Sequence, residues 1–265
     1  MAADDFEDDF QEETVFSDNE PATEEQELAT GSKRKDIPDL EDQPKKKKKK
    51  QPKKKKISSN PFDTIEIWKE NTKIQAAYLI DRQKIALPKL SEVELEEQQL
   101  PEFAIVNNEK FKQEHILDAL PNYVKFGVAG HKKLLKKPTV SASPVALVVT
   151  HSAIRAVDLA RGLKSFESAK IAKLFAKHFK IEEQVNFLER EPIHIGVGTP
   201  NRLQVLVDQG HLNLDHLELV IIDTEKNAKK FNIFDIQDVR ADLFNFLGSH
   251  ISYLMKENRT KIGLF

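Results

Sequence analysis

The fold is decided by the stretch Ile-His-Ile-Gly-Val-Gly-Thr-Pro-Asn-Arg-Leu, residues 193–203. Its first half is a short, mostly apolar run, which predicts a buried strand over residues 193–197. The Gly-Thr-Pro that follows, at 198–200, suits a sharp turn into a helix, because Thr can cap a helix and Pro fits its first turn. We therefore predict a helix over residues 202–209. The exposed amides of such a turn can hold a phosphate group.

The same alternation of strand and helix extends in both directions from this stretch. Further strands are predicted at 146–149, 170–175, 219–222 and 261–265, with helices at 154–163, 182–189 and 238–247. Strands separated by helices with short links imply right-handed crossovers and a parallel sheet covered on both faces. The sequence therefore predicts an α/β domain.

Helices are predicted before the first strand. The first spans residues 60–83, with Asn60 as its cap, and a short acidic helix follows over 91–99. A third is predicted over 108–120, ended by Pro121.

The small net charge conceals two oppositely charged tail blocks. The 265 residues include 41 Lys plus Arg and 43 Asp plus Glu, a formal charge of −2. Residues 1–30 hold 12 acidic side chains and no basic one, whereas residues 31–56 hold 13 basic and 4 acidic ones. Such segments cannot bury enough apolar surface to offset an ordering entropy of roughly 1–2 kcal/mol per residue. We predict a disordered tail over 1–57, a helical extension over 58–137 and an α/β core over 138–265.

The basic block resembles a bipartite nuclear import signal. Its two clusters are about ten residues apart, a spacing typical of such signals, and the same lysines also attract nucleic-acid phosphates. We therefore predict nuclear localisation and an import receptor as partner; a generic solvated lysine tract is the alternative. The residues assigned to the signal are Lys33, Arg34, Lys35, Lys45, Lys46, Lys47, Lys48, Lys49, Lys50, Lys53, Lys54, Lys55 and Lys56.

The composition also argues against several classes of protein. The chain has no cysteine, which excludes disulfides, thiolate nucleophiles and cysteine zinc sites and fits a reducing compartment. No apolar run approaches the roughly 18–20 residues of a membrane helix, and the acidic start is unlike a secretory signal. We expect no membrane association.

The stretch that decides the fold also resembles a known family. A strand followed by Gly-Thr-Pro-x-Arg-Leu is similar to the RNA-gripping motif in the first RecA-like domain of DEAD-box RNA helicases, with Asn201 in place of the usual Gly. Leu219-Val220-Ile221-Ile222-Asp223 resembles the approach to the Asp-Glu-Ala-Asp box of that family. Residues 146–150 with 152–155 resemble the strand and loop that carry its Pro-Thr-Arg-Glu-Leu element, with Arg155 as the counterpart of the Arg. The resemblance implies a single RecA-like domain.

The departures from the helicase pattern concern the catalytic groups. The chain has Asp223-Thr224-Glu225-Lys226 at the box, so Thr224 replaces the Glu that activates water in the family. It contains neither Gly-Lys-Ser nor Gly-Lys-Thr, and phosphoryl transfer depends on such a cradle and on Mg²⁺. We predict no enzymatic activity, no cofactor, no bound metal and no small-molecule substrate. Asp223 is expected to remain as a hydrogen-bonding group, with Mg²⁺ binding as the alternative.

A second resemblance is closer. Residues 173–178, 196–200 and 263–265 together are similar to the Cms-type family of degenerate DEAD-box-like proteins associated with small ribosomal subunit assembly. This resemblance covers roughly residues 60–265. It implies a nuclear, nucleolar pre-ribosome component, with Ala176-Lys177-His178 in place of the Gly-Gly loop of true helicases.

The candidate nucleic-acid-binding residues share a position near the carboxyl ends of predicted strands, where α/β sheets bind ligands. Each basic one has a structural alternative: an Arg on a helix is usually solvated, and a His beside an apolar run is usually a hydrogen-bonded structural residue. The candidates are Arg155, Lys177, His178, Gly198, Thr199, Pro200 and Arg202.

The function predicted from these observations is a non-catalytic nuclear factor. It would bind pre-ribosomal RNA and small-subunit assembly factors during ribosome assembly and rRNA processing. Two alternatives remain: a residual nucleotide-binding ATPase or RNA helicase, and a nuclear regulator of DNA replication or the cell cycle, since a lysine tract attracts either nucleic acid.

Overall fold

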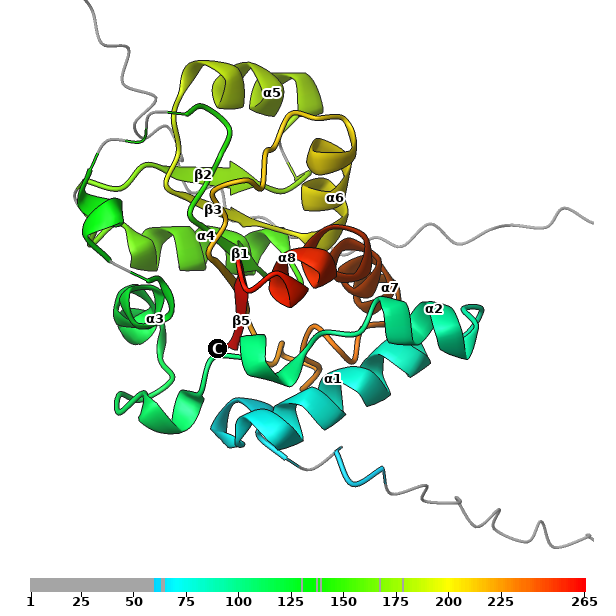
Figure 1. The fold of residues 1–265 in the computed structure, drawn as a ribbon. Coiled ribbons are helices and arrows are strands. Elements are labelled where there is room, and N and C mark those ends of the chain that lie inside the picture. The colour runs from blue at the N-terminus through cyan, green and yellow to red at the C-terminus, as the bar shows by residue number, and fades with distance from the viewer. Residues whose placement is uncertain are drawn as a thin grey trace, which may run out of the picture. The chain divides into compact units, whose positions relative to one another are not determined.

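A parallel sheet of five strands forms the centre of the described chain (Figure 1). The computed structural model describes residues 60–265 except 63, 64, 130, 137, 139, 167 and 178. The tail, with every residue of the predicted import signal, and His178 therefore lie outside the described residues. Described residues from 60 onward belong to one compact unit.

The strands run in the order β2-β3-β1-β4-β5. Every pairing is parallel, and the register places Val149 beside both Gly198 and Ile222. The carboxyl ends of the strands therefore meet at one edge of the sheet. The bounds are β1 Ala146–Val149, β2 Ile171–Leu174, β3 Ile195–Gly198, β4 Leu219–Ile222 and β5 Lys261–Leu264.

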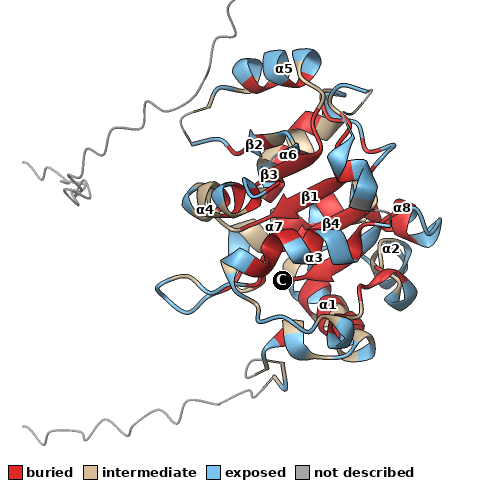
Figure 2. Ribbon diagram, turned by 90° about the vertical axis from the view of Figure 1, so that its left-hand side faces the viewer, coloured by how far each residue is buried: buried red, intermediate tan, exposed pale blue. Residues whose placement is uncertain are grey.

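Helices cover both faces of the sheet, because alternate side chains of each strand point to opposite sides. One apolar cluster joins Leu147 and Val149 of β1 to the helices α1, α6, α7 and α8; the other joins Val148 to α3 and α4. Figure 2 shows the strands buried between these layers. The helices are α1 Thr72–Ala86, α2 Glu92–Glu97, α3 Leu120–Gly127, α4 Ala153–Leu163, α5 Ile181–Arg190, α6 Pro200–Asp208, α7 Gln237–Phe246 and α8 Ser252–Lys256.

Shorter helical turns connect these elements. A π-helical segment, Leu247–Ile251, joins α7 to α8. Among the described residues, 3₁₀ turns occur at Ile67–Lys69, Glu102–Ala104, Asn108–Lys110, Leu117–Ala119 and His131–Leu135. No helix in the described part of the chain is both long enough and apolar enough to cross a membrane.

The predicted α/β class with a parallel sheet preceded by helices is confirmed, and each predicted strand is present within two residues of its expected bounds. The extension before the sheet differs from the prediction. The first long helix starts at Thr72 rather than near Asn60, because Asn71 caps it by accepting a hydrogen bond from the Ile74 amide at 3.0 Å. The Asn60 side chain instead donates to Asp81 of α1, at 3.0 Å.

The predicted helix over residues 108–120 is also wrong. That stretch contains only two 3₁₀ turns, and α3 begins where the predicted helix was expected to end. Pro121 lies in the first turn of α3, where its missing amide costs no helical hydrogen bond. Proline thus marks the start of a helix here and not its end.

Candidate functional site

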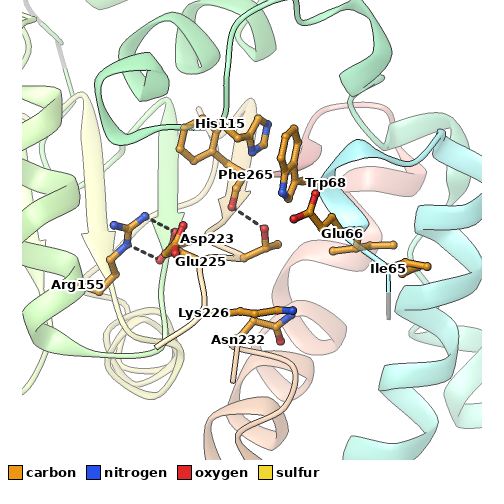
Figure 3. A pocket seen from close by; sticks show the side chains of 12 residues that line it. Ile65, Glu66, Trp68, His115, Arg155, Asp223, Glu225, Lys226, Asn232 and Phe265 are labelled. Atoms are coloured by element: carbon orange, nitrogen blue, oxygen red, sulfur yellow. Dashed lines mark hydrogen bonds and ion pairs between the residues drawn. The ribbon is translucent and has the colours of Figure 1, made fainter. Parts of the chain in front are cut away.

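A pocket lies at the carboxyl ends of β4 and β5, the edge of the sheet where α/β folds bind ligands (Figure 3). Its volume is ≈ 150 Å³, about half the lower end of roughly 300 Å³ typical of small-molecule sites. Residues from both the sheet and the segment before α1 form its wall. They are Ile65, Glu66, Ile67, Trp68, His115, Arg155, Asp223, Thr224, Glu225, Lys226, Asn232 and Phe265.

Asp223 lies at the end of β4 and is completely buried. Arg155 of α4 donates to both of its carboxylate oxygens, from Nε and from Nη2, each at 3.0 Å. Thr150, at the end of β1, donates its hydroxyl to Asp223 Oδ2 at 2.7 Å. Burial by itself would lower the pKa of Arg155, but the hydrogen bond and negative charge of Asp223 outweigh it and leave that pKa raised. The prediction that Asp223 remains as a hydrogen-bonding group is confirmed.

Thr224 ties the ends of β4 and β5 together. Its hydroxyl donates to the Phe265 carbonyl at 3.0 Å, and its backbone amide donates to the same oxygen. The Thr224 side chain is thus engaged in a structural hydrogen bond. A hydroxyl also has no basicity with which to activate water at neutral pH.

Three stacked rings line the side of the pocket away from Lys226 and Asn232 (Figure 3). His115 stacks on Trp68 with ring centroids 3.9 Å apart and on Phe265 at 4.4 Å. Burial, with a smaller contribution from the charge of Lys69, lowers the pKa of His115 to about 4. The imidazole is therefore neutral at physiological pH and is stacked between the rings of Trp68 and Phe265.

This ring stack was not predicted from the sequence. Its members are separated by 47 and 150 positions in the chain, and only Phe265 lies in a segment, 263–265, that resembles a known family. The one available signal was composition, since Trp68 is the single Trp of the chain. A lone Trp indicates a buried or stacked site but not its partners.

The glycine of the Gly-Thr-Pro turn has a packing role. A Cβ on Gly198 would lie only 2.2 Å from the carbonyl oxygen of Leu174 in β2. The neighbouring strand therefore approaches too closely for any larger residue, and Thr199 donates its amide to that same carbonyl at 3.2 Å. Pro200 starts α6 as expected. The turn can be explained by the sheet alone.

Arg202 points back toward the protein and not freely into solvent. Its Nη1 donates to Gln184 Oε1 of α5 at 2.8 Å, and the amide of Gln184 donates to the carbonyls of Lys173 at 2.8 Å and Phe175 at 3.0 Å. Burial lowers the pKa of Arg202, against the opposing charge of Glu182. Arg202 therefore supports α5 against the edge strand β2. Its Nη1 and Nη2 also donate to the Phe179 carbonyl, each at 3.4 Å, just after the turn that carries Lys177.

Among the described residues, the predicted ones lie at one edge of the sheet but have different surroundings. Arg155 binds Asp223 and Arg202 binds Gln184, so both guanidinium groups have internal partners. Lys177 is exposed on the turn after β2. Whether any of these residues contacts RNA stays a prediction.

Comparison with known proteins identifies related chains. A family model described as CMS1, U3-containing 90S pre-ribosomal complex subunit, matches residues 14–265. Protein CMSS1 of Xenopus laevis is 33% identical over 265 residues, covering 94% of each chain. Protein CMSS1 of Homo sapiens is 35% identical over 175 residues, covering 65% of this chain and 61% of the human one.

A fungal relative and a solved structure extend the comparison. Protein CMS1 of Chaetomium thermophilum is 35% identical over 161 residues, covering 60% of this chain and 64% of its own. A Saccharomyces cerevisiae Dbp5 variant bound to Nup159, a Gle1 variant, IP6 and ADP is 15% identical, with a TM-score of 0.38. That match covers 71% of this chain and 45% of the other.

Proposed function

The chain belongs to the CMS1 family, described as a U3-containing 90S pre-ribosomal complex subunit, and from this membership we propose a non-catalytic role in small ribosomal subunit assembly and rRNA processing. In this role it binds pre-ribosomal RNA and other assembly factors. It works in the nucleus, within the nucleolus, and an import receptor carries it there through the lysine tract of residues 33–56.

The observation that carries the non-catalytic part is the state of Asp223. Mg²⁺-dependent phosphoryl transfer needs a carboxylate that faces the metal and its water ligands. Here both carboxylate oxygens accept hydrogen bonds from Arg155 and Thr150, and the side chain has no exposed surface. Freeing Asp223 for a metal ion would leave the Arg155 charge without its partner.

The pocket itself supports the same proposal. Its wall carries Glu66 and Glu225 as well as Lys226, so the charges facing it are mixed and do not favour a polyphosphate. Glu66 is paired with Lys69, which lowers the pKa of the Glu66 carboxyl. The ring stack adds apolar surface to the wall. The buried polar groups at this site bind other groups of the protein, so the site is poorly suited to binding a nucleotide.

Affinity for RNA is expected to come largely from the tail. The basic and acidic residues of 57–265 nearly balance, at 28 against 27, whereas residues 45–56 contain ten lysines. Each phosphate neutralised by a lysine releases condensed counterions, which makes binding strong at low salt and steeply salt-dependent. The folded body then supplies whatever selectivity the protein has.

The test of this proposal uses the full chain in two measurements. Isothermal titration with Mg-ATP is expected to show no binding at micromolar nucleotide, and RNA is expected not to stimulate hydrolysis. Either activity would support the residual ATPase or helicase instead.

The second measurement is crosslinking and sequencing of bound nucleic acid in cells. We expect small-subunit precursor RNA; recovery of chromatin would instead support a DNA-directed regulator. Deleting residues 45–56 should leave the protein in the cytoplasm, and unchanged nuclear accumulation would contradict the import assignment.

A further inference from the structure

A basic loop with an exposed aromatic ring follows β4 directly. Residues 226–231, Lys-Asn-Ala-Lys-Lys-Phe, contain three lysines and no acidic residue, and we call them the Lys-Phe loop. All three lysines are exposed, and 49% of the Phe231 surface is accessible to solvent. Between residues 223 and 240, Phe231 is the one large apolar residue that is exposed. A single exposed phenylalanine is common on protein surfaces; the informative feature of Phe231 is that the exposed lysines of the same short loop lie beside it in the chain.

The Lys-Phe loop is held in one conformation by the side chain of Asn227. Its Oδ1 accepts hydrogen bonds from the amides of Lys229 at 2.9 Å and Phe231 at 3.1 Å. The backbone closes the same turn, since the Asn227 amide donates to the Phe231 carbonyl at 2.9 Å and the Lys230 amide donates to the Asn227 carbonyl at 2.8 Å. The exposed ring is therefore presented by an ordered turn.

Lys230 has a φ of +63°, in the left-handed region that residues with a Cβ rarely adopt. Such a conformation is strained for a residue with a Cβ and is found most often at functional sites. A glycine at this position would form the turn without that strain. The chain instead keeps a long cationic side chain here.

The base of the loop is fixed in the core. Asn232 is buried and accepts a hydrogen bond from the Phe234 amide at 2.9 Å, and Phe234 is completely buried against Tyr78. Lys226, at the other end of the loop, lines the pocket together with Asn232 (Figure 3). The loop thus projects from the same edge of the sheet as Asp223, next to the end of β4.

We propose that the Lys-Phe loop binds single-stranded RNA, with Phe231 stacking on a base and Lys229 and Lys230 contacting the adjacent phosphates. This proposal rests on the proposed RNA-binding function and assigns it a site. Proteins that bind single strands combine cations along the backbone with an aromatic ring under a base. A protein partner is less well matched, because the cores of protein interfaces are apolar and depleted in lysine.

The ring is tested with binding of the full chain to a fluorescent oligouridine and to an abasic strand of equal length. Because stacking on an aromatic ring contributes to single-strand binding, Phe231→Leu should weaken oligouridine binding about tenfold, whereas Phe231→Trp should retain it. Neither variant should change binding to the abasic strand, which offers no ring to stack on. Phe103→Leu is the matched control: Phe103 is 64% exposed but lies beside Glu102 and not among lysines, so no change is expected.

The lysines are tested by the salt dependence of oligouridine binding. For single strands the slope of log K against log salt changes by about 0.7 for each phosphate contact. Replacing both Lys229 and Lys230 by Gln should therefore flatten the slope by about 1.4. An unchanged slope would overturn the phosphate contacts.

The outcomes separate the loop from the wider function. If the unaltered chain bound neither strand, the proposed RNA binding itself would be wrong. If it bound oligouridine and Phe231→Leu bound equally well, the loop assignment would be wrong while the function stood. Loss of a co-purifying assembly protein in Phe231→Leu, with RNA affinity intact, would identify the loop as a protein contact and overturn the proposal.

Discussion

The end of β4 carries two neighbouring groups of residues with opposite designs. Asp223 is buried, and its charge is neutralised and hydrogen-bonded by Arg155 and Thr150. Three residues later the Lys-Phe loop begins, where lysines and a phenylalanine face solvent on a turn held by its own backbone and Asn227. The polar atoms of the first group form hydrogen bonds within the protein. The second group is held by hydrogen bonds within its own turn, and its side chains are free to contact a binding partner.

We expect residues on the Asp223 side of this short segment to contribute to stability, and residues of the Lys-Phe loop to contribute to binding. Asp223 forms a bridge between β4, β1 and α4, so changes there should be measured mainly as changes in the free energy of unfolding. Changes in the loop should alter binding with little effect on folding. A large stability effect of changes in the loop, or a pure binding effect of changes at Asp223, would contradict this division.

The largest effect is expected on removing the partner of Asp223. Arg155→Met roughly keeps the length of the side chain but removes the cation that pairs with Asp223. The Asp223 carboxylate, which has no exposed surface, would then be left unpaired. Breaking a buried ion pair in this way typically costs about 3–5 kcal/mol, because the remaining charge is desolvated and unpaired. Urea denaturation monitored by circular dichroism should show this loss.

The matched control is Arg161→Met on the same helix. The Arg161 side chain is 65% exposed, and its Nη1 lies 3.9 Å from Asp158 Oδ1 in an i,i+3 surface pair. Such pairs contribute 0–1 kcal/mol, so the control should unfold almost as the unaltered chain does. Equal losses in the two variants would mean that Asp223 is hydrated and free, and the non-catalytic proposal would lose its main support.

A smaller, pH-dependent effect is expected from His115 in the ring stack. Its pKa is about 4 in the folded protein, against an ordinary value of about 6.5 in the unfolded chain. Between these values the unfolded state binds a proton that the folded state does not, so stability falls as pH decreases from about 6.5 to about 4. Above pH 6.5 the two states bind equally and the contribution vanishes.

The measurement compares the unaltered chain with His115→Phe, which keeps a ring between Trp68 and Phe265 but cannot titrate. Because His115 is only half-buried, solvent screening reduces the expected difference to about 1–2 kcal/mol between pH 7 and pH 4.5. Other groups, His151 included, titrate in both chains and cancel in the difference. Parallel stability curves over this range would show that the stack opens to solvent.

The sheet could be predicted from the sequence because its signals are local. Apolar runs such as 219–222, bounded by turn residues, are long enough to define a buried strand without knowledge of the partner strands. The segment before the sheet lacks such signals: Asn60 and Asn71 are both suitable caps, and only the tertiary contact of Asn60 with Asp81 decides between them. Pro121 can equally end one helix or start another.

The candidate site was harder to predict than the fold for the same reason. Sequence patterns identified Arg155, Arg202 and Asp223 as unusual, but not that each arginine has an internal partner, since Arg155 and Asp223 are 68 positions apart. The ring stack depends on equally distant contacts. The Lys-Phe loop is contiguous, yet its signal is conformational: the positive φ of Lys230 and the exposure of Phe231 cannot be read from composition.

The smallest effect, and the one that tests the loop side of the comparison most sharply, is expected from Lys230→Gly. Glycine adopts a φ of +63° without the steric cost of a Cβ, of roughly 1–2 kcal/mol, but loses more conformational entropy on folding. The net gain should be about 0.5 kcal/mol of unfolding free energy.

The matched control is Lys229→Gly, which removes the same charge at a residue without a positive φ and should therefore lose a few tenths of a kcal/mol of unfolding free energy. Both variants should weaken RNA binding, because each removes one cation. If Lys230→Gly raises and Lys229→Gly lowers the free energy of unfolding, while both lose the same affinity, then Lys230 serves binding through its charge and destabilises the turn. If Lys230→Gly is instead destabilised, Lys230 has a structural role, as Asp223 and Arg155 do.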